Sequence, residues 1–427
     1  MKRNILRIIL VLVLLVAICV PTTIYVYAKS SKVNVDLPFV EEGTLKGTDY
    51  KISVPDEWNG TLLVFAHGYS PDLWPPRITP GMDPLTEVLL LDERYALAGS
   101  SFSSGGWAIR EGIENTKDLV NYFKRHVGKP EHVIVWGESL GAGVALKCIE
   151  KYPGIFDGAV SEGGPIAGLP MQADWGLGLR LAYDLVFDWP VEDWGPLGDA
   201  KDGIDFMEFM DIILPQYLDN ANYGKWEFIR MVVDFPVDAL WAMSPYGAPW
   251  PIVAYSFFTI DIAGLEQKAK GPVMQNLDHV YSLTEDEIDY LEGLGVDATS
   301  LLAAMNAMTD IEASNPARKY LERYFEFSGD ITGPVITIHN IGDPLCIVAH
   351  TGVYRDVVVE AGNADLLFQV FSDSVGHCNF TIDQYVLMLN AMKAWLDGTA
   401  DPSTQAWASV GLITSPPEGI PSWPFAE

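Results

Sequence analysis

The chain has few basic residues for its size. Lysine and arginine together number 27 against 57 aspartate and glutamate residues, which gives a formal net charge of −30 over 427 residues. Binding to nucleic acid requires a positive surface that neutralises phosphate groups. The charge balance therefore predicts no nucleic-acid partner, and it indicates a strongly hydrated surface.

Cysteine and histidine are also scarce. The sequence has four cysteines and seven histidines, without a CxxC pair or a histidine-rich cluster of the kind that holds zinc. We therefore expect no metal site. Three cysteines lie beyond the first 28 residues, Cys148, Cys346 and Cys378. An exported protein can keep a disulfide, and three thiols allow one pair.

The first 28 residues have the pattern of an export signal. Three basic residues precede the apolar run IILVLVLLVAICV, and Val26 and Ala28 suit a signal-peptidase site. An uncleaved membrane anchor is the alternative, because residues 8–28 are just long enough to span a bilayer. Both interpretations place the rest of the chain outside the cytoplasm, either secreted or attached to the membrane by its N-terminal segment.

Strand and helix patterns alternate in the next part of the chain. Residues 41–68 have the pattern of a β-meander, and apolar runs in RYALAGSS, HVIVWG and DGAVSEGG predict further strands. Helix patterns separate them at about residues 110–127 and in AGVALKCIEKYP. Strands that alternate with helices favour a mostly parallel sheet flanked by helices.

The alternation stops for about 160 residues and then returns. The pattern from residue 165 to about 329 is helical and contains six of the 13 tryptophans, whereas GPVITIHNIGD and LLFQVF are again typical of strands. The chain therefore divides into a leader or anchor (1–28), the first part of an α/β core (29–165), a helical cap insertion (166–327), the second part of the core (328–400) and an irregular tail (401–427). We expect the insertion to line an aromatic pocket.

A serine stands at the turn between a predicted strand and a predicted helix. The sequence from Gly137 to Gly141, GESLG, fits the G-x-S-x-G motif in the strand–turn–helix context that a nucleophile elbow requires. Glycines permit the tight turn because they lack a Cβ atom. A helix N-cap is the alternative role for this serine. We interpret Ser139 as a catalytic nucleophile.

A serine nucleophile needs a base that is itself oriented by an acid. His377 is the candidate base, because it stands in the loop SVGHCNF between the last strand and the final helix. His350 is an alternative without a comparable loop. Asp343 is the candidate acid, because it follows the strand VITIHN directly, and Asp373 is its rival. The order serine, aspartate, histidine is that of α/β-hydrolases.

Acyl transfer also needs two donors for the developing oxyanion. The backbone N–H of Leu140, directly after the serine, is one candidate. The second is the N–H of Tyr69 in the segment FAHGYS, which ends an early strand. An ordinary turn is the alternative for that segment.

These motifs together resemble the α/β-hydrolase superfamily, across about residues 49–164 and 328–396. The resemblance depends on four short segments, HGY, GESLG, GDP and GHC. A closer similarity, to exported bacterial esterases and prolyl-oligopeptidase-like hydrolases, lies in two segments, YALAGSSFSSGGWAI and VGKPEHVIVWGESLGAGVAL. The cysteine after His377 also resembles tannase and feruloyl esterase relatives, in which a second cysteine stands where this chain has Glu138.

The predicted function is that of an exported serine esterase that acts through an acyl-enzyme. Its substrate is a small-molecule or polymeric ester, and the triad chemistry needs no cofactor. The alternative is a serine peptidase of prolyl-oligopeptidase type, which uses the same triad. A non-catalytic binding module is a third hypothesis, against which the complete triad argues.

The positions of two cysteines predict a disulfide. Cys346 lies three residues after Asp343, and Cys378 directly follows His377. If the acid and the base are hydrogen-bonded, their loops are neighbours, and the two Cα atoms fall within the roughly 4.4–6.8 Å that a disulfide requires. Cys148 lies on the elbow helix and is expected to be a small buried residue.

Overall fold

The computed structural model describes residues 33–71, 77–277 and 279–415. The predicted leader at residues 1–28 lies outside these ranges, and so do the last 12 residues of the predicted tail, 416–427. Within the described ranges, none of the helices combines the length and the apolar character that crossing a membrane requires.

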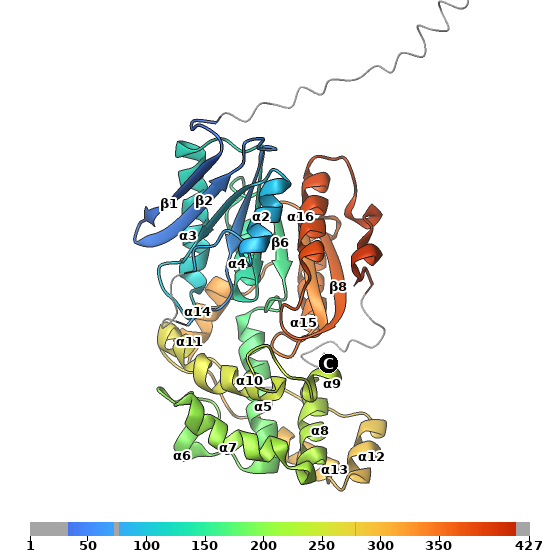
Figure 1. Cartoon of the computed structure of the whole chain (residues 1–427). Coiled ribbons are helices and arrows are strands. Elements are labelled where there is room, and N and C mark those ends of the chain that lie inside the picture. Colours follow the sequence, from blue (N-terminus) through green and yellow to red (C-terminus); the bar gives the residue numbers. More distant parts are fainter. Residues whose placement is uncertain (1–32, 72–76, 278, 416–427) are drawn as a thin grey trace, which may run out of the picture.

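A single nine-stranded sheet organises the core (Figure 1). Its spatial order is β1-β2-β4-β3-β5-β6-β7-β8-β9. The strands β3 to β8 are parallel, whereas β1, β2 and β9 join as antiparallel strands at the two edges. Their bounds are β1 Phe39–Leu45, β2 Thr48–Val54, β3 Thr61–Ala66, β4 Ala96–Ser100, β5 His132–Glu138, β6 Gly158–Glu162, β7 Val335–Gly342, β8 Leu367–Val375 and β9 Leu412–Ile413.

Helices cover both faces of this sheet because the central strands are apolar on both sides. Along β3, Leu62 and Val64 belong to one hydrophobic cluster, while Leu63 and Phe65 belong to the other. The helices α3 and α4 and part of α15 pack in the first cluster, and α2 and α16 pack in the second. Their bounds are α2 Pro84–Asp92, α3 Ile109–His126, α4 Leu140–Lys151, α15 His350–Glu360, with the short η3 Ala364–Leu366 after it, and α16 Ile382–Leu396. The prediction of a mostly parallel sheet flanked by helices is confirmed.

The segment between β6 and β7 is built from helices. Figure 1 shows these helices stacked on one end of the sheet, with α10 close to the core. The elements are α5 Leu169–Phe187, α6 Val191–Trp194, α7 Phe206–Leu218, η1 Asn220–Asn222, α8 Tyr223–Val232, α9 Val237–Leu240, α10 Trp250–Ser256, η2 Phe257–Asp261, α11 Ile262–Ala269, α12 Glu285–Gly293, α13 Ala298–Asn306 and α14 Asn315–Phe325. We call residues 166–327 the helical insertion. Of these elements, η2 is a π-helical turn, a distortion that often occurs near functional sites.

Two sequence expectations about the edges of the sheet are wrong. The first three strands do not form a meander, because β2 pairs with β4 rather than with β3. The tail is not irregular in its described part, which forms η4 Pro402–Thr404, η5 Trp407–Val410 and strand β9. Trp407 is only 2% exposed and stacks on Phe368 of β8, so burial of this indole fixes the segment against the sheet.

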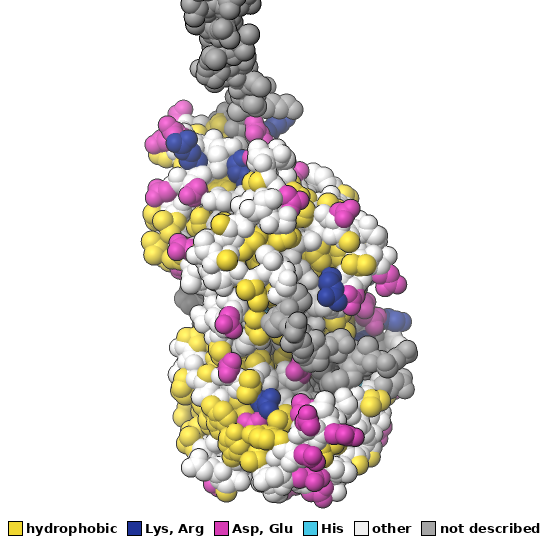
Figure 2. Space-filling view, turned by 90° about the vertical axis from the view of Figure 1, so that its right-hand side faces the viewer, with side chains coloured by type: hydrophobic (Ala, Val, Ile, Leu, Met, Phe, Trp, Pro, Cys, Tyr) yellow, Lys and Arg dark blue, Asp and Glu magenta, His cyan; other side chains and the backbone are white. Residues whose placement is uncertain are grey.

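The negative charge of the chain is spread over both parts of the molecule. On the face shown in Figure 2, acidic side chains outnumber basic ones on the core and on the insertion. Charge of one sign distributed in this way favours hydration of the surface.

Candidate active site

Ser139 occupies a strained backbone conformation between β5 and α4. Its φ is 52° and its ψ is −123°, a region that residues with a Cβ atom rarely adopt. Backbone hydrogen bonds hold it there, because the Ser139 N–H donates to Glu162 O at 2.9 Å and Ala142 N–H donates to Ser139 O at 3.0 Å. The side chain makes no N-cap hydrogen bond. The alternative interpretation of this serine as a helix cap is therefore wrong.

The glycines around Ser139 are required by close backbone contacts. A Cβ atom on Gly141 would lie 1.9 Å from Ala66 O, and one on Gly137 would lie 2.5 Å from Gly141 O. On the other side of the serine, a Cβ atom on Gly68 would lie 3.2 Å from Ser139 Cβ. The motif therefore allows strand β5, helix α4 and the loop after β3 to meet at one point.

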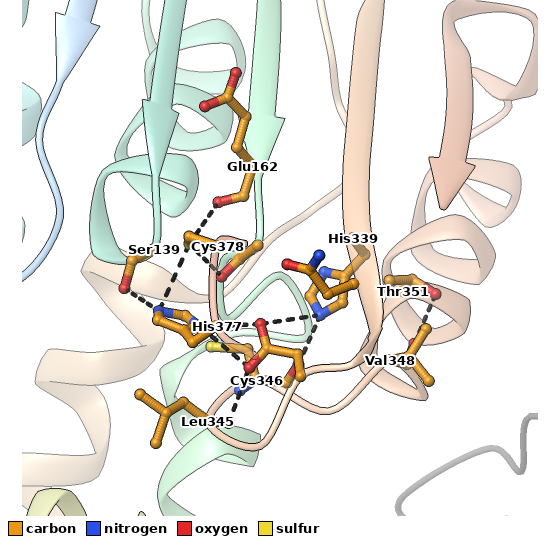
Figure 3. Close-up of polar contacts among 12 residues, drawn as sticks. Ser139, Glu162, His339, Leu345, Cys346, Val348, Thr351, His377 and Cys378 are labelled. Atoms are coloured by element: carbon orange, nitrogen blue, oxygen red, sulfur yellow. Dashed lines mark hydrogen bonds and ion pairs between the residues drawn. The ribbon is translucent and has the colours of Figure 1, made fainter. Parts of the chain in front are cut away.

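The structure brings together the three residues that the sequence assigns to a triad, of which Figure 3 labels Ser139 and His377. His377 Nε2 lies 2.8 Å from Ser139 Oγ, and His377 Nδ1 lies 2.9 Å from Asp343 Oδ2. They come from the turn after β5, the loop after β8 and the loop after β7. The rival acid Asp373 lies within β8 and is exposed, so the imidazole faces Asp343 instead.

Hydrogen bonds from its own loop hold the carboxylate of Asp343 in place. Its side chain is fully buried, and its Oδ1 accepts the backbone N–H groups of Leu345 and Cys346, both at 2.9 Å. His339 lies beside it, with Nε2 at 2.6 Å from Cys346 O. Burial lowers the pKa of His339, so this imidazole is neutral at pH 7. The acid loop is thus held rigidly in a position that orients the His377 ring.

Opposing effects act on the pKa of His377. Burial of the imidazole lowers it, but the negative charge of Asp343 and the hydrogen bond to that carboxylate raise it, with a smaller upward contribution from Glu138. The net direction is upward from the ordinary value of about 6.5. Stabilisation of the imidazolium suits a base that must accept and hold a proton during catalysis.

The two residues predicted to supply the oxyanion donors lie in the same pocket as Ser139. Leu140 is the first residue of α4, where a backbone N–H has no partner within the helix. Tyr69 follows Gly68, the residue that lies against the Ser139 side chain. Its hydroxyl donates to Asp261 Oδ1 at 2.9 Å, which links the loop after β3 to the helical insertion.

The predicted disulfide between Cys346 and Cys378 is not formed, and both residues are free thiols. Cys378 has a φ of 51°, and its Sγ points to the backbone carbonyl of Glu162 at 3.6 Å (Figure 3). Cys346 is buried and donates its backbone N–H to Asp343. The loops are neighbours as expected, but the Cys378 sulfur is directed toward the serine side of the site. It lies 3.7 Å from His377 Nε2.

The triad opens into a pocket of about 450 Å³ between the core and the insertion. Aromatic residues of the core and the insertion form one wall, where Tyr69, Trp107 and Phe257 have ring centroids 5.1–5.5 Å apart. The pocket residues are Gly68, Tyr69, Pro71, Arg77, Trp107, Glu138, Ser139, Leu140, Pro165, Leu169, Gln172, Pro245, Tyr246, Val253, Ser256, Phe257, Asp261, Leu345, Cys346, His377 and Cys378. The tryptophans of the insertion are not among these lining residues.

Sequence reasoning did not identify several polar residues of this pocket. Arg77 forms an ion pair with Glu138 of the elbow motif, with Nη1 and Oε1 2.7 Å apart. Gln172 and Asp261 reach the pocket from α5 and η2. Glu138 was visible as a motif position, whereas Arg77, Gln172 and Asp261 carry no local sequence signal. Among the described residues, no cluster of histidine, cysteine or acidic side chains is arranged to hold a metal ion.

Comparison with known proteins gives one similar sequence of nearly full length. An o-phthalyl amidase from Xanthobacter agilis is 28% identical over 428 residues, which cover 88% of this chain and 92% of that protein. No model of a protein family matches the chain.

Similar solved structures include two from Aspergillus oryzae. One is an esterase, 12% identical with a TM-score of 0.43 over 86% of this chain and 81% of that one. The other is feruloyl esterase B, 15% identical with a TM-score of 0.43 over 84% and 80%. An acylaminoacyl peptidase from Pyrococcus horikoshii is 12% identical with a TM-score of 0.41 over 84% of this chain and 41% of that one. By the order of its strands and the strained serine turn between β5 and α4, this chain is an α/β-hydrolase in fold, as its motifs predict.

Proposed function

We propose that this chain is a serine hydrolase that cleaves carboxylic esters through a covalent acyl-enzyme. The observation that carries the proposal is the continuous hydrogen-bonded chain from Ser139 Oγ through His377 to Asp343, at 2.8 and 2.9 Å. Nucleophile, base and orienting acid are recognised by this geometry rather than by their positions in the sequence.

In the first half of the reaction, Ser139 Oγ attacks the ester carbonyl carbon while its proton passes to His377 Nε2. The negative charge that develops on the carbonyl oxygen is received by the backbone N–H groups of Leu140 and Tyr69. The intermediate then collapses: the carbon–oxygen bond to the alcohol breaks, and the leaving alkoxide takes the proton from His377. The acyl group stays bonded to Ser139.

The second half uses the same groups in reverse. His377 accepts a proton from a water molecule, the resulting hydroxide attacks the acyl carbon, and the oxyanion is again received by the two N–H groups. Breakage of the bond to Ser139 Oγ returns the proton to the serine and releases the carboxylic acid. Asp343 holds the imidazole in the tautomer that both steps need and stabilises the imidazolium.

The helical insertion acts as a cap in this proposal. It contributes Phe257, Asp261 and Gln172 to the walls of the pocket, and Trp250 packs against Gly376 in the loop that carries His377. A mostly apolar wall with a few polar groups is typical of a site for a small organic substrate. The basic residues and apolar run at the start of the sequence support export of the enzyme.

Amide hydrolysis is a second candidate. The same triad cleaves amides when His377 protonates the departing nitrogen, and the similar protein from Xanthobacter agilis is named an o-phthalyl amidase. The two activities differ only in the leaving group.

The proposal is tested by replacing the nucleophile. Ser139→Ala is expected to lower the hydrolysis of p-nitrophenyl acyl esters by at least about 10³-fold, because removal of a triad member has effects of this size. A fluorophosphonate probe should label the wild type at Ser139 and leave the variant unlabelled.

Ser256→Ala is the matched control, because Ser256 lines the same pocket but donates its hydroxyl to Val253 O. This variant should keep its activity within a few-fold of the wild type. Ester hydrolysis that survives in a folded Ser139→Ala variant would contradict the proposed function.

A further inference from the structure

Asp261 is an acidic residue in the wall of the active-site pocket, and it forms no ion pair with any described residue. It is the last residue of η2 in the helical insertion and is half-buried. Burial raises the pKa of its carboxyl, and the hydrogen bond from the Tyr69 hydroxyl opposes this effect. A carboxylate that is partly withdrawn from water without a cation beside it is unfavourable, and a bound cation would relieve this cost.

The position of this carboxylate is fixed by three contacts. Asp261 Oδ1 receives the Tyr69 hydroxyl at 2.9 Å, and the backbone carbonyl of Asp261 receives the indole N–H of Trp107 at 2.7 Å. The π-helical turn itself is closed by the hydrogen bond from Ile262 N–H to Phe257 O. Asp261 Oδ2 makes no hydrogen bond within the described ranges, yet it is not a fully buried atom. This oxygen is therefore accessible to a ligand in the pocket.

The pocket surface beside the carboxylate is aromatic. Tyr69 and Phe257 are half-buried pocket residues whose ring centroids lie 5.5 Å apart. Trp107 packs against both rings, at 5.5 Å from Tyr69 and 5.1 Å from Phe257. Aromatic rings attract ammonium cations and also contact their apolar substituents. A carboxylate beside such rings suits a cationic group that carries methyl or methylene groups.

The other charged groups of the pocket leave the charge of Asp261 uncompensated. Arg77 is the one lysine or arginine among the described residues that line the pocket, and it is paired with Glu138 at 2.7 Å. The carboxylate of Asp343 is bound to His377 at 2.9 Å. The pocket therefore has an excess of negative charge on the side of Asp261, which attracts cations and repels anions.

Resting on the proposed serine mechanism, we propose that the preferred substrates are esters that carry an ammonium group, which binds at Asp261 Oδ2. Asp261 is then a specificity-determining residue. Tyr69 links it to the reaction, because the Tyr69 hydroxyl holds the carboxylate and the Tyr69 backbone N–H receives the oxyanion in the proposed mechanism. The ammonium group belongs either to the acyl half or to the alcohol half of the ester, and the test uses one pair of substrates for each case.

Each pair consists of a cationic ester and a neutral ester of the same shape. For the acyl half, the p-nitrophenyl ester of 4-(trimethylammonio)butanoic acid is compared with that of 5,5-dimethylhexanoic acid. For the alcohol half, butyrylcholine is compared with 3,3-dimethylbutyl butyrate by titration of the released acid. The readout is the ratio of kcat/KM for the cationic ester to kcat/KM for the neutral ester. General damage to the triad lowers both values and leaves this ratio unchanged.

Asp261→Asn removes the charge but keeps an oxygen that accepts the Tyr69 hydroxyl. We expect the wild type to prefer the cationic ester in at least one pair. Asp261→Asn should lower that ratio by about 10- to 100-fold, because one charge at a partly desolvated site has an effect of this size. Asp238→Asn is the matched control, because it changes the net charge equally at an exposed residue of α9 outside the pocket lining. It should leave the ratio within about twofold of the wild type, which separates local binding from the attraction exerted by the whole negative surface.

A wild type without a cationic preference in either pair would overturn the inference, and so would a preference that persists in Asp261→Asn. Both results leave the proposed function in place, since the neutral esters are still hydrolysed. A wild type that hydrolyses no member of either pair contradicts the proposed function instead. If Asp261→Asn does not fold, the wild type is assayed with a neutral ester in tetramethylammonium chloride and in sodium chloride at equal ionic strength. Competitive inhibition by tetramethylammonium is then expected, and equal rates in the two salts would refute the cation site.

Discussion

Replacing the candidate nucleophile by glycine is expected to stabilise the protein relative to replacing it by alanine. Both variants lose the hydroxyl and its hydrogen bond to His377, so this loss cancels in the comparison. They differ at the backbone, because Ser139 has a φ of 52° and a ψ of −123°. Alanine keeps the Cβ atom that makes this conformation unfavourable, whereas glycine adopts it readily.

The magnitude follows from two opposing contributions. A residue with a Cβ atom in such a conformation carries about 1–3 kcal/mol of strain. Glycine costs about 0.5–1 kcal/mol in additional conformational entropy of the unfolded chain. Ser139→Gly should therefore exceed Ser139→Ala in free energy of unfolding by about 0.5–2 kcal/mol. With an unfolding entropy of about 2.1 cal/mol/K per residue, this corresponds to a rise in Tm of about 0.5–2 °C.

Calorimetric melting of both variants at one pH measures the difference, and urea titration gives the same comparison independently. Ala303 provides the matched control, because it is exposed in helix α13 and has an ordinary helical backbone. Ala303→Gly should lower the stability by about 1 kcal/mol. A Ser139→Gly variant that is no more stable than Ser139→Ala would refute the argument that the elbow stores strain at this residue.

Three further outcomes are expected. Glu138→Gln removes a negative charge that raises the pKa of His377. The acid limb of the plot of kcat/KM against pH should therefore move to lower pH. An acid limb that stays in place, measured between pH 4 and 9, would exclude this influence of Glu138. Gly141→Ala places a Cβ atom 1.9 Å from Ala66 O. It should destabilise the fold by about 3 kcal/mol or more, or prevent folding, and circular dichroism melting would detect either result. A variant as stable as the wild type would contradict this prediction. Burial raises the pKa of Asp234 to about 7, so the folded state retains a proton that the unfolded chain releases near pH 4, and stability should fall between these values. Asp234→Asn should lack that decline and gain stability over the wild type at pH 8 but not at pH 4, which urea titrations at the two pH values would show.

The predictable parts of the site are those that a short segment of the sequence specifies by its residue types and their spacing. Ser139 was identifiable because its strained turn requires glycines at fixed spacing within a strand–turn–helix pattern. His377 and Asp343 were identifiable because each follows a strand that ends at the same edge of a parallel sheet. The structure brings these three side chains together by hydrogen bonds, and their catalytic roles are the proposal made above.

The expectations that failed depended on directions in space. The disulfide required the Cys378 sulfur to point toward Cys346, but a positive φ directs it to the backbone of Glu162. The meander required β3 to pair with its neighbour in sequence, but β3 lies between β4 and β5. The positions of two segments in the sequence can indicate that they are neighbours, but they do not determine which atoms of the two segments face each other.

The sequence by itself determined the class of the fold, the serine turn and the two loops that meet it, because apolar periodicity and glycine spacing are local properties of the chain. The tertiary structure alone decided what surrounds the scissile bond. Gln172, Arg77 and Asp261 lie far apart in sequence, and no motif marks them. They line one pocket because packing of the helical insertion against the sheet places them there, and such packing depends on the whole chain.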